Sequence, residues 1–323
     1  MTIRHEAPET FWDDVISKSS CATYFHTRQW ADLICNSFPH IECASQGYIL
    51  NDGTRAILPL VKQSFKKKKN KYSSIEPGVY GGLLTDGRQV TEQECREIFS
   101  ELKNVDVCES YVFGNPFCEL CMPSQFERRK MFTQVIRLNE SFDRIWANYK
   151  SSVRKQVRKA HKRCLQIRVA DRLKDYKKYF QLYQEALERW GDKVHCQYPF
   201  AIFKNIYLLA DPRIKLWLCT HDSEIKGGII TFYCNGHVVT WHSAFDHLCF
   251  PHGISNYMFN ELILHAAENG YRVFDFNPSA GIEGVVRFKQ NFGTERLYFD
   301  MFCWPQRAIG KIKSKVKKVI FKT

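Results

Sequence analysis

The sequence lacks the features that would place the chain in a membrane or outside the cell. It has no run of about 18 apolar residues, so we expect no membrane-spanning helix. Its first residues, MTIRHEAPETFWDD, contain no apolar segment of the kind that a signal peptide needs. Together these absences predict a cytoplasmic protein.

The sequence also lacks the spacing of a disulfide framework or a metal site. Its thirteen cysteines are odd in number and irregularly spaced, which is typical of reduced, buried thiols. Cys118 and Cys121 form a CxxC without a second pair at zinc-finger spacing. Four histidines recur at every fifth position, namely His237, His242, His247 and His252. Neighbours at this spacing face opposite sides of a strand, so we expect no bound metal.

The composition is that of a folded, basic protein. Of the 323 residues, 44% are hydrophobic and 25% are charged, which suits one large domain or two ordinary ones. The formal net charge is +13 and the pI is about 9.1. This excess favours anionic partners such as nucleotide phosphates, RNA or an anionic membrane surface, without choosing among them.

The first half of the chain shows an ordered series of elements. A hairpin at 48–61 has its turn at Asn51-Asp52-Gly53, a strong hairpin signal. A glycine-rich strand end at 79–83, a helix at about 91–102 and a strand at 105–113 follow.

The second half repeats this order. A hairpin at 216–233, a strand at 237–244, a helix at 254–268 and a strand at 272–276 follow one another. The two halves share this order but little residue identity. The pattern predicts two similar α/β domains that meet near residue 135.

A strongly basic segment connects the two halves. Residues 141–165 have the periodicity of one long helix with a narrow apolar stripe, formed by Val153, Val157, Ala160 and Cys164. On the outer side a cation recurs every four residues, at Lys150, Arg154, Arg158 and Lys162. Such a helix is either a solvated surface or a binding surface for the phosphates of a nucleotide, RNA or a lipid-linked diphosphate.

Two pieces of the C-terminal region suit ligand binding. The loop His252-Gly253 precedes a helix, where backbone amides can hold an anion, while Ser255 and Asn256 also suit ordinary helix caps. Asp275 ends a buried strand, where ligands gather in open α/β sheets. It equally suits a structural anchor for a neighbouring turn.

A third piece, the segment 281–295, has the pattern of a short amphipathic helix. Phe288 and Phe292 are four residues apart and can share a buried face, so that Arg287 and Lys289 would point elsewhere. Gly293 suits a helix stop. By pattern alone the charges of this helix are solvated.

The run DFNPSAGIEGVVRFKQNFG at 275–293 resembles the C-terminal signature of the FemAB-like transferases and related GNAT-like acyltransferases. In those sequences a strand ending in Asp precedes a glycine-bearing loop, a Phe-Lys and a Phe-Gly. Looser similarities cover most of residues 20–303, namely Phe25 with Trp30, Tyr80-Gly81-Gly82, the basic helix with Arg154 and Arg158, and Trp241 to Asp246. Two features depart from the family: Cys164 replaces a usual glycine, and no coiled-coil arm is inserted.

The resemblance implies an α/β (α+β) fold of two tandem GNAT-like domains, each a mixed central sheet flanked by helices. It implies an N-terminal domain at 1–135 and a catalytic domain with the basic helix at 136–305. A basic tail follows at 306–323. Within that tail an apolar stripe that includes Ile309 and Val316 faces a lysine-rich side, which predicts binding to an anionic membrane surface through 309–322.

The resemblance also implies roles for particular side chains in the transfer of an acyl group to an amine. The implied catalytic residues are Lys289, Asp275 and His242, with Lys289 near the oxyanion or the donor phosphate. The implied donor-binding residues are His252, Gly253, Asn256 and Arg287. The implied residues for the acceptor or its phosphates are Lys150, Arg154, Arg158, Trp241 and Tyr80.

The expected function is therefore an acyltransferase of cell-envelope or polysaccharide biosynthesis, at the inner face of the membrane. Its co-substrate would be acyl-CoA, with no permanently bound cofactor, and its acceptor an amino sugar or amino acid, free or linked to a lipid or nucleotide. One alternative is a FemAB-type peptidyltransferase that uses aminoacyl-tRNA. Another is a non-enzymatic membrane- or RNA-binding module on the same fold.

Overall fold

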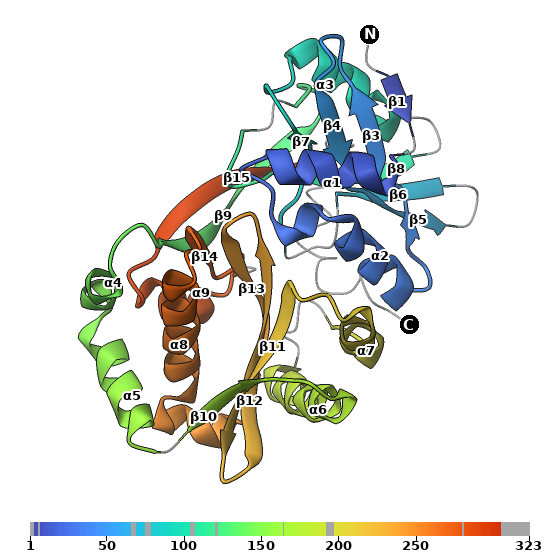
Figure 1. Ribbon diagram of the computed structural model, residues 1–323. Helices are drawn as coiled ribbons and strands as arrows, with labels where there is room; N and C mark the ends of the chain where they lie inside the picture. The colour runs from blue at the N-terminus through green and yellow to red at the C-terminus, as the bar shows by residue number, and fades with distance from the viewer. Residues whose placement is uncertain are drawn as a thin grey trace. The chain divides into compact units, whose positions relative to one another are not determined.

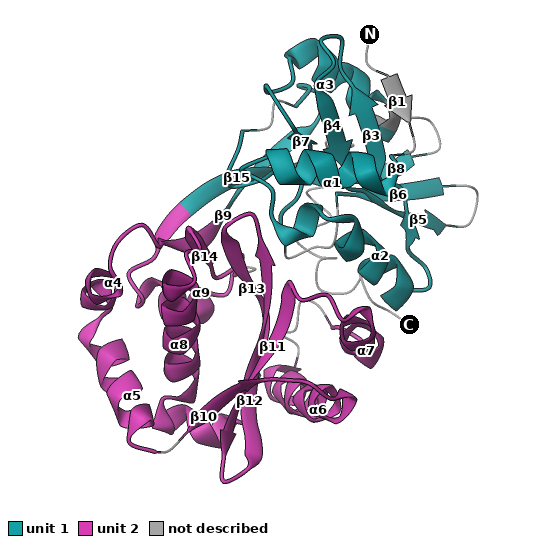
Figure 2. Ribbon diagram, in the orientation of Figure 1, with its two compact units in different colours: residues 1–132, 297–323 teal, residues 133–296 magenta. Residues whose placement is uncertain are grey.

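The computed structural model describes residues 3–5, 7–65, 69–74, 79–103, 107–119, 122–163, 165–191, 197–279 and 281–304. The chain divides into two compact units, which Figure 2 colours separately. Unit 1 is Met1–Phe132 with the segment from Leu297 onward, and unit 2 is Thr133–Arg296. The predicted tail at 306–323 lies outside the described residues, as do Cys121 and Cys164.

Where the structure describes unit 1, it has short strands and three helices (Figure 1). The helices are α1 (Glu9–Lys18), α2 (Arg28–Ser37) and α3 (Glu92–Ile98), with 3-10 turns η1 (Tyr24–His26) and η2 (Ser100–Lys103). The strands are β1 (Ile3–His5), β2 (Glu42–Cys43), β3 (Gln46–Ile49), β4 (Arg55–Leu58), β5 (Val61–Phe65), β6 (Lys69–Ser73), β7 (Leu84–Thr85) and β8 (Val107–Phe113). The predicted first hairpin is confirmed, because β3 and β4 pair antiparallel on either side of the predicted turn.

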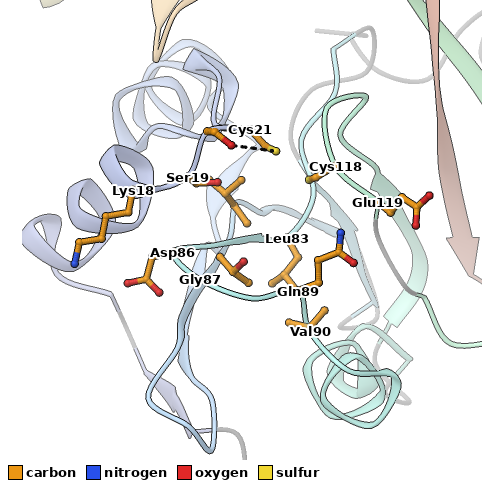
Figure 3. Close-up of a pocket in the computed structure, with 13 residues that line it drawn as sticks. Lys18, Ser19, Cys21, Leu83, Asp86, Gly87, Gln89, Val90, Cys118 and Glu119 are labelled. Carbon is orange, nitrogen blue, oxygen red and sulfur yellow. Dashed lines mark hydrogen bonds between the residues drawn. The ribbon is translucent and has the colours of Figure 1, made fainter.

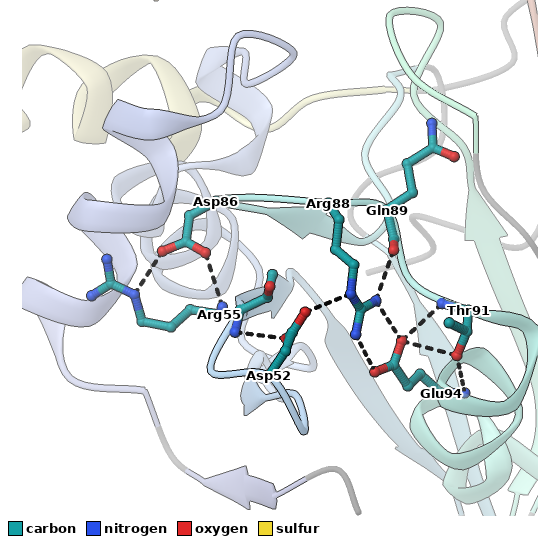
Figure 4. Close-up of polar contacts among 8 residues, drawn as sticks. Asp52, Arg55, Asp86, Arg88, Gln89, Thr91 and Glu94 are labelled. Carbon is teal, nitrogen blue, oxygen red and sulfur yellow. Dashed lines mark hydrogen bonds and ion pairs between the residues drawn. The ribbon is translucent and has the colours of Figure 1, made fainter.

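A chain of charged side chains fixes the loops of unit 1 (Figure 4). The Arg88 guanidinium donates hydrogen bonds to Asp52 and to both carboxylate oxygens of Glu94. Glu94 in turn accepts from the backbone and the hydroxyl of Thr91, the residue that caps α3. This capping box satisfies amide groups that have no partner inside the helix.

Unit 2 contains the longest strands and most of the helices (Figure 1). The helices are α4 (Phe142–Asn148), α5 (Ser151–His161), α6 (Leu173–Trp190), α7 (Phe200–Leu209), α8 (Ile254–Glu268) and α9 (Glu283–Gln290), with the 3-10 turn η4 (His247–His252). Its own strands are β10 (Gln166–Val169), β11 (Ile214–His221), β12 (Glu224–Cys234), β13 (His237–Phe245) and β14 (Val273–Asp275), and it shares β9 (Glu127–Arg137) and β15 (Glu295–Trp304) with unit 1. The predicted second hairpin and the helix at 254–268 are confirmed.

The strands form one large and one small sheet. The large sheet has eleven strands in the order β10-β11-β12-β13-β14-β9-β15-β8-β6-β5-β2, and the small one has the order β1-β3-β4-β7. The mixed α/β class is therefore confirmed. The expected pair of separate central sheets is not found among the described residues, because β9 and β15 are neighbours that each carry residues of both units.

The central strands of unit 2 are covered by helices on both faces. From Gly227 to Cys234 every residue of β12 is buried, as expected for a strand between two helical layers. On one face the apolar stripe of α5 packs with α8 around Ile229 and Val238. On the other face α6 approaches so closely that a Cβ on Gly228 would lie 2.9 Å from the Tyr179 ring.

The predicted single helix at 141–165 is wrong, because the chain breaks between α4 and α5. Tyr149 and Lys150 are extended, with ψ of 144° and 147°. The Lys150 amide donates to the carbonyl of Asn291, a contact distant in sequence that helix periodicity does not reveal. The apolar stripe of the second part is confirmed, since Val153, Val157 and Ala160 are all buried.

Candidate active site

The candidate site of unit 2 lies where β13 and β14 part. The two strands pair in parallel up to Val239 and Asp275, and then β14 ends while β13 continues to Phe245. Directly after this point β13 has a bulge, because Ile230 pairs with His242 but Thr231 pairs with Thr240. Trp241 is thus the extra residue. Bulges re-aim side chains and are common next to active sites.

Asp275 is a completely buried carboxylate at the end of β14. One of its oxygens accepts a hydrogen bond of 2.5 Å from the Thr133 hydroxyl and one of 2.7 Å from the Asn277 amide. Hydrogen bonds from neutral donors stabilise an ionised carboxylate in a buried place. Asp275 therefore holds Asn277 in a left-handed conformation with φ of 61°, which supports the anchor role as well as a catalytic one.

Lys289 is buried beside this turn, with an exposed fraction of 6%. Its Nζ donates to the carbonyl oxygens of Asn277 at 2.6 Å and Pro278 at 3.4 Å. Burial lowers the pKa of Lys289 to about 7, against the opposing effect of the Asp275 carboxylate. The expectation that the charges of this helix are solvated is wrong for Lys289, because α9 turns this residue inward.

Arg287, two residues earlier, does lie in solvent. Its side chain is 72% exposed and reaches Glu283 of the same helix at 3.9 Å. The rings of Phe288 and Phe292 lie 5.3 Å apart and pack with Phe259 of α8, as the spacing predicts. The inward turn of α9 thus separates the two neighbouring cations, so that one faces the strand end and the other faces water.

His242 stands on the bulge within a group of aromatic side chains. Its Nδ1 lies 2.6 Å from the Tyr179 hydroxyl. The rings of Tyr183, Tyr198 and Phe203 surround the imidazole at centroid distances of 4.5 to 5.7 Å. This burial lowers the pKa of His242 to about 3 and raises that of Tyr179.

The depressed pKa of His242 keeps its imidazole neutral near pH 7. A neutral imidazole has one N–H donor and one acceptor nitrogen. The Tyr179 hydroxyl therefore donates to Nδ1 in one tautomer and accepts from it in the other. In either tautomer the contact fixes the orientation of the ring on the bulge.

The expected donor loop at the start of α8 is packed against α5. Gly253 has φ of 79°, and a Cβ there would lie 2.6 Å from the Gln156 carbonyl oxygen. Lys159 of α5 donates to the carbonyl of Pro251 at 2.9 Å. Burial lowers the pKa of His252, as do the charges of Arg163 and Lys159. The N-terminus of α8 is therefore a positive region, made partly by α5.

The expected acceptor residues are dispersed. Arg154 donates to the carbonyls of Ala147 and Tyr149, so it caps α4. The guanidinium of Arg158 lies over the Trp146 ring at 5.8 Å. Lys150 is exposed at the start of α5, and Asn256 is half-buried in the first turn of α8.

The position of Tyr80 does not agree with its implied role in binding the acceptor. It is completely buried in unit 1 among the rings of Phe25, Phe117 and Phe299, so it packs a core and offers no surface to an acceptor. Trp241 is largely buried as well, at 4.8 Å from the Tyr198 ring. Of the predicted acceptor residues, Trp241 is the one next to a predicted catalytic residue, His242.

Two of the cavities among the described residues are lined by other side chains than the predicted site residues. One, of about 190 Å³ in unit 1, is lined by residues that include Lys18, Cys21, Asp86 and Cys118 (Figure 3). The other, of about 280 Å³ in unit 2, is lined by residues of β9, α4 and the turn after α9, including Arg137 and its ion-pair partner Glu295. Neither contains a predicted site residue. Within the described ranges no group of three metal-ligating side chains gathers, and no helix is long and apolar enough to cross a membrane.

Sequence reasoning missed the residues that support the site from other elements. Thr133 lies in β9, 142 positions before Asp275, and Tyr179 lies in α6, 63 positions before His242. Neither belongs to a local motif. The signal that the sequence did contain is the pair of polar residues Thr133 and Gln134 within the apolar run at the end of β9.

Comparison with known proteins assigns the second half of the chain. Residues 147–290 match a family model described as an acetyltransferase (GNAT) domain. This segment contains Lys289, Asp275, the bulge and α8. No curated protein matches the chain.

Solved structures resemble the chain over its whole length. FemX is 12% identical with a TM-score of 0.73, covering 97% of this chain and 100% of FemX. L-PGS from Bacillus licheniformis is 10% identical with a TM-score of 0.59, covering 98% of each chain. A conserved protein of unknown function from Bacteroides thetaiotaomicron is 10% identical with a TM-score of 0.59, covering 94% of this chain and 99% of that one. At such identities the similarity to these structures concerns the fold alone. The indication of acyl transfer comes from the family model. Residues 147–290 thus match an acetyltransferase (GNAT) domain, which indicates an N-acyltransferase enzyme, and the fold of the chain is similar to that of FemX.

Proposed function

We propose that the chain transfers an acyl group from acyl-CoA to the amine of an amino sugar or amino acid in a cell-envelope or polysaccharide precursor. The observation that carries this proposal is the buried Lys289 of α9, whose Nζ donates to the turn at Asn277 that follows Asp275 and β14. The GNAT domain supports an acyl-CoA donor and an amine acceptor. No contact of the described residues selects the acceptor itself.

The geometry suits attack of an amine on a thioester carbonyl. The C–N bond forms, the C–S bond breaks, and the thiolate that leaves takes up the proton that the amine loses. In its protonated form Lys289 has three N–H donors, of which two are held by the carbonyls of Asn277 and Pro278. In this form the third N–H can stabilise the carbonyl oxygen as it gains negative charge.

Lys289→Met tests this proposal, with Arg287→Gln as the matched control on the same helix. We expect Lys289→Met to lower kcat about 100-fold or more on a panel of acyl-CoA donors and amine acceptors, because one oxyanion donor is worth about this much. Arg287→Gln should retain wild-type turnover. Equal turnover of both variants would remove Lys289 from the mechanism.

A second candidate donor is aminoacyl-tRNA. The exposed cations of α5 favour it, since Lys155, Arg158, Lys159 and Lys162 all face solvent on a helix without acids. The resemblance of the run at 275–293 to the FemAB-like transferases supports it as well. A gel-shift titration at low salt separates the two donors: tRNA binding that is lost with rising salt supports the second, and its absence leaves acyl-CoA.

A further inference from the structure

The turn η4 presents two large apolar side chains to solvent. Leu248 is 69% exposed and Phe250 is 43% exposed. Cys249, between them, packs against the core of unit 2, so its neighbours remain on the outside. Asp246 accepts a hydrogen bond from the Leu248 amide at 3.0 Å and caps the turn. The two side chains are therefore held outward by a fixed backbone.

A row of cations lies beside this turn. Lys159 reaches the Pro251 carbonyl of η4 from α5. Lys155 and Lys162 are four residues before and three after it, so they extend along the same side of the helix, and both are exposed. The guanidinium of Arg189 lies 5.6 Å from the Phe250 ring on the α6 side. Cations thus approach the apolar tip from two helices.

The acidic residues nearby do not cancel this charge. Glu224 and Asp246 both pair with Lys226, at 2.7 Å and 3.8 Å. The segment from 144 to 170, which includes α5, has no acidic residue at all. The surface made by Leu248, Phe250 and the α5 lysines, here called the η4 surface, is therefore apolar at its tip and positive at its side.

We propose that the η4 surface binds an anionic lipid membrane, with Leu248 and Phe250 inserted among the acyl chains and the α5 lysines against the headgroups. Both features favour binding to a lipid interface, since the apolar side chains are removed from water and the cations approach the negative headgroups. RNA would attract the lysines and could stack a base on the Phe250 ring, but it would not bury the exposed Leu248. This surface differs from the predicted C-terminal tail, and it does not depend on the identity of the donor.

Binding to vesicles tests the proposal with the full-length chain. Leu248→Ser with Phe250→Ser should weaken binding to vesicles of phosphatidylcholine and phosphatidylglycerol by about tenfold or more, because two apolar side chains lose their burial. Leu208→Ser is the matched control, since Leu208 on α7 is 61% exposed and lies on a different helix. It should leave binding unchanged.

The charge arm uses Lys155→Gln with Lys162→Gln, against Lys174→Gln with Lys177→Gln on α6 as the control. The α5 pair should weaken binding about fivefold for each lysine, and vesicles of phosphatidylcholine alone should abolish the difference. If the α5 pair instead weakens tRNA binding while the Leu248 and Phe250 variant binds vesicles like the wild type, the surface serves nucleic acid and the proposal is overturned.

Hydrogen exchange on the unmodified chain gives an independent measurement. Anionic vesicles should slow amide exchange in a peptide that covers η4 and leave a peptide that covers α7 unchanged. Unchanged exchange in η4, with vesicles bound, would place the contact elsewhere and overturn the proposal. Turnover of a soluble amine by the Leu248 and Phe250 variant should stay at the wild-type level. A loss of vesicle binding can therefore be told apart from a loss of the proposed acyl transfer.

Discussion

Helices α5 and α9 both carry basic residues, but they use them in opposite ways. In α5 the cations lie outside, over a buried stripe of Val153, Val157 and Ala160. In α9 the one buried residue is a cation, Lys289, while Val285 is 37% exposed. Folding leaves a solvated lysine in water at little cost in free energy. The ammonium group of a buried lysine loses its water, and hydrogen bonds must offset that desolvation cost. The cost of burying Lys289 is what makes it a candidate for chemistry.

The largest expected effect tests how rigidly α5 is fixed to α8. Gly253→Ala should lower the free energy of unfolding by about 3 kcal/mol, because alanine is strained at positive φ and its Cβ would meet the Gln156 carbonyl. Chemical denaturation measures this. Gly270→Ala is the control for φ alone, since Gly270 has φ of 73° and open space around it. Similar losses of stability in the two variants would show that the α5 backbone at Gln156 moves to accept the added Cβ without cost.

The next effect tests the burial of Lys289 through pH. The pKa of Lys289 is about 7 in the folded chain and near 10.5 as an ordinary value. Between these values the unfolded chain holds a proton that the folded chain does not, so the free energy of unfolding rises with pH. From about pH 7 to about pH 9 the wild type should gain roughly 2 kcal/mol relative to Lys289→Met. Parallel pH profiles of the two proteins would mean that Lys289 titrates as a solvated lysine.

A smaller effect tests the support of Asp275. Thr133→Val should cost about 1–2 kcal/mol of stability, because it removes a hydrogen bond to a buried carboxylate. It should also lower kcat, since Asp275 holds the Asn277 turn that binds Lys289. Thr240→Val is the control, as its hydroxyl donates to the backbone carbonyl of Asp275 instead. Equal kcat values in the two variants would leave Thr133 with a packing role.

The smallest effect concerns the exposed cations. Lys155→Gln with Lys162→Gln should change the free energy of unfolding by less than about 0.5 kcal/mol, because neither side chain is buried. A gain in stability is consistent with relief of repulsion between like charges on one helix. A loss above about 1 kcal/mol would show that these exposed lysines stabilise the fold, so that they would not differ from the buried Lys289 in the way argued above.

Much of unit 2 was predictable because its signals are local. The hairpin of β11 and β12, the helix α8 and the strand β14 follow from alternation, caps and apolar runs. Helices α6 and α7 were not predicted. Their buried residues do lie at helical spacing, as at Tyr176, Tyr179 and Tyr183 of α6, so this local signal was overlooked. Their contacts with each other and with β13, such as Tyr179 with Phe203 and Phe203 with His242, are the part that only the tertiary structure shows.

The sequence by itself determined the mixed α/β class, the order of elements around the site and the motif that ends in Phe288-Lys289 and Phe292-Gly293. It also determined that α5 carries cations without acids. Tertiary structure decided which cations are buried. The turn at Asn277 faces its carbonyl toward Lys289, and Thr133 and Tyr179 reach the site from distant elements. Burial and hydrogen bonding set the protonation of Lys289 and His242, and both depend on neighbours that are remote in the chain.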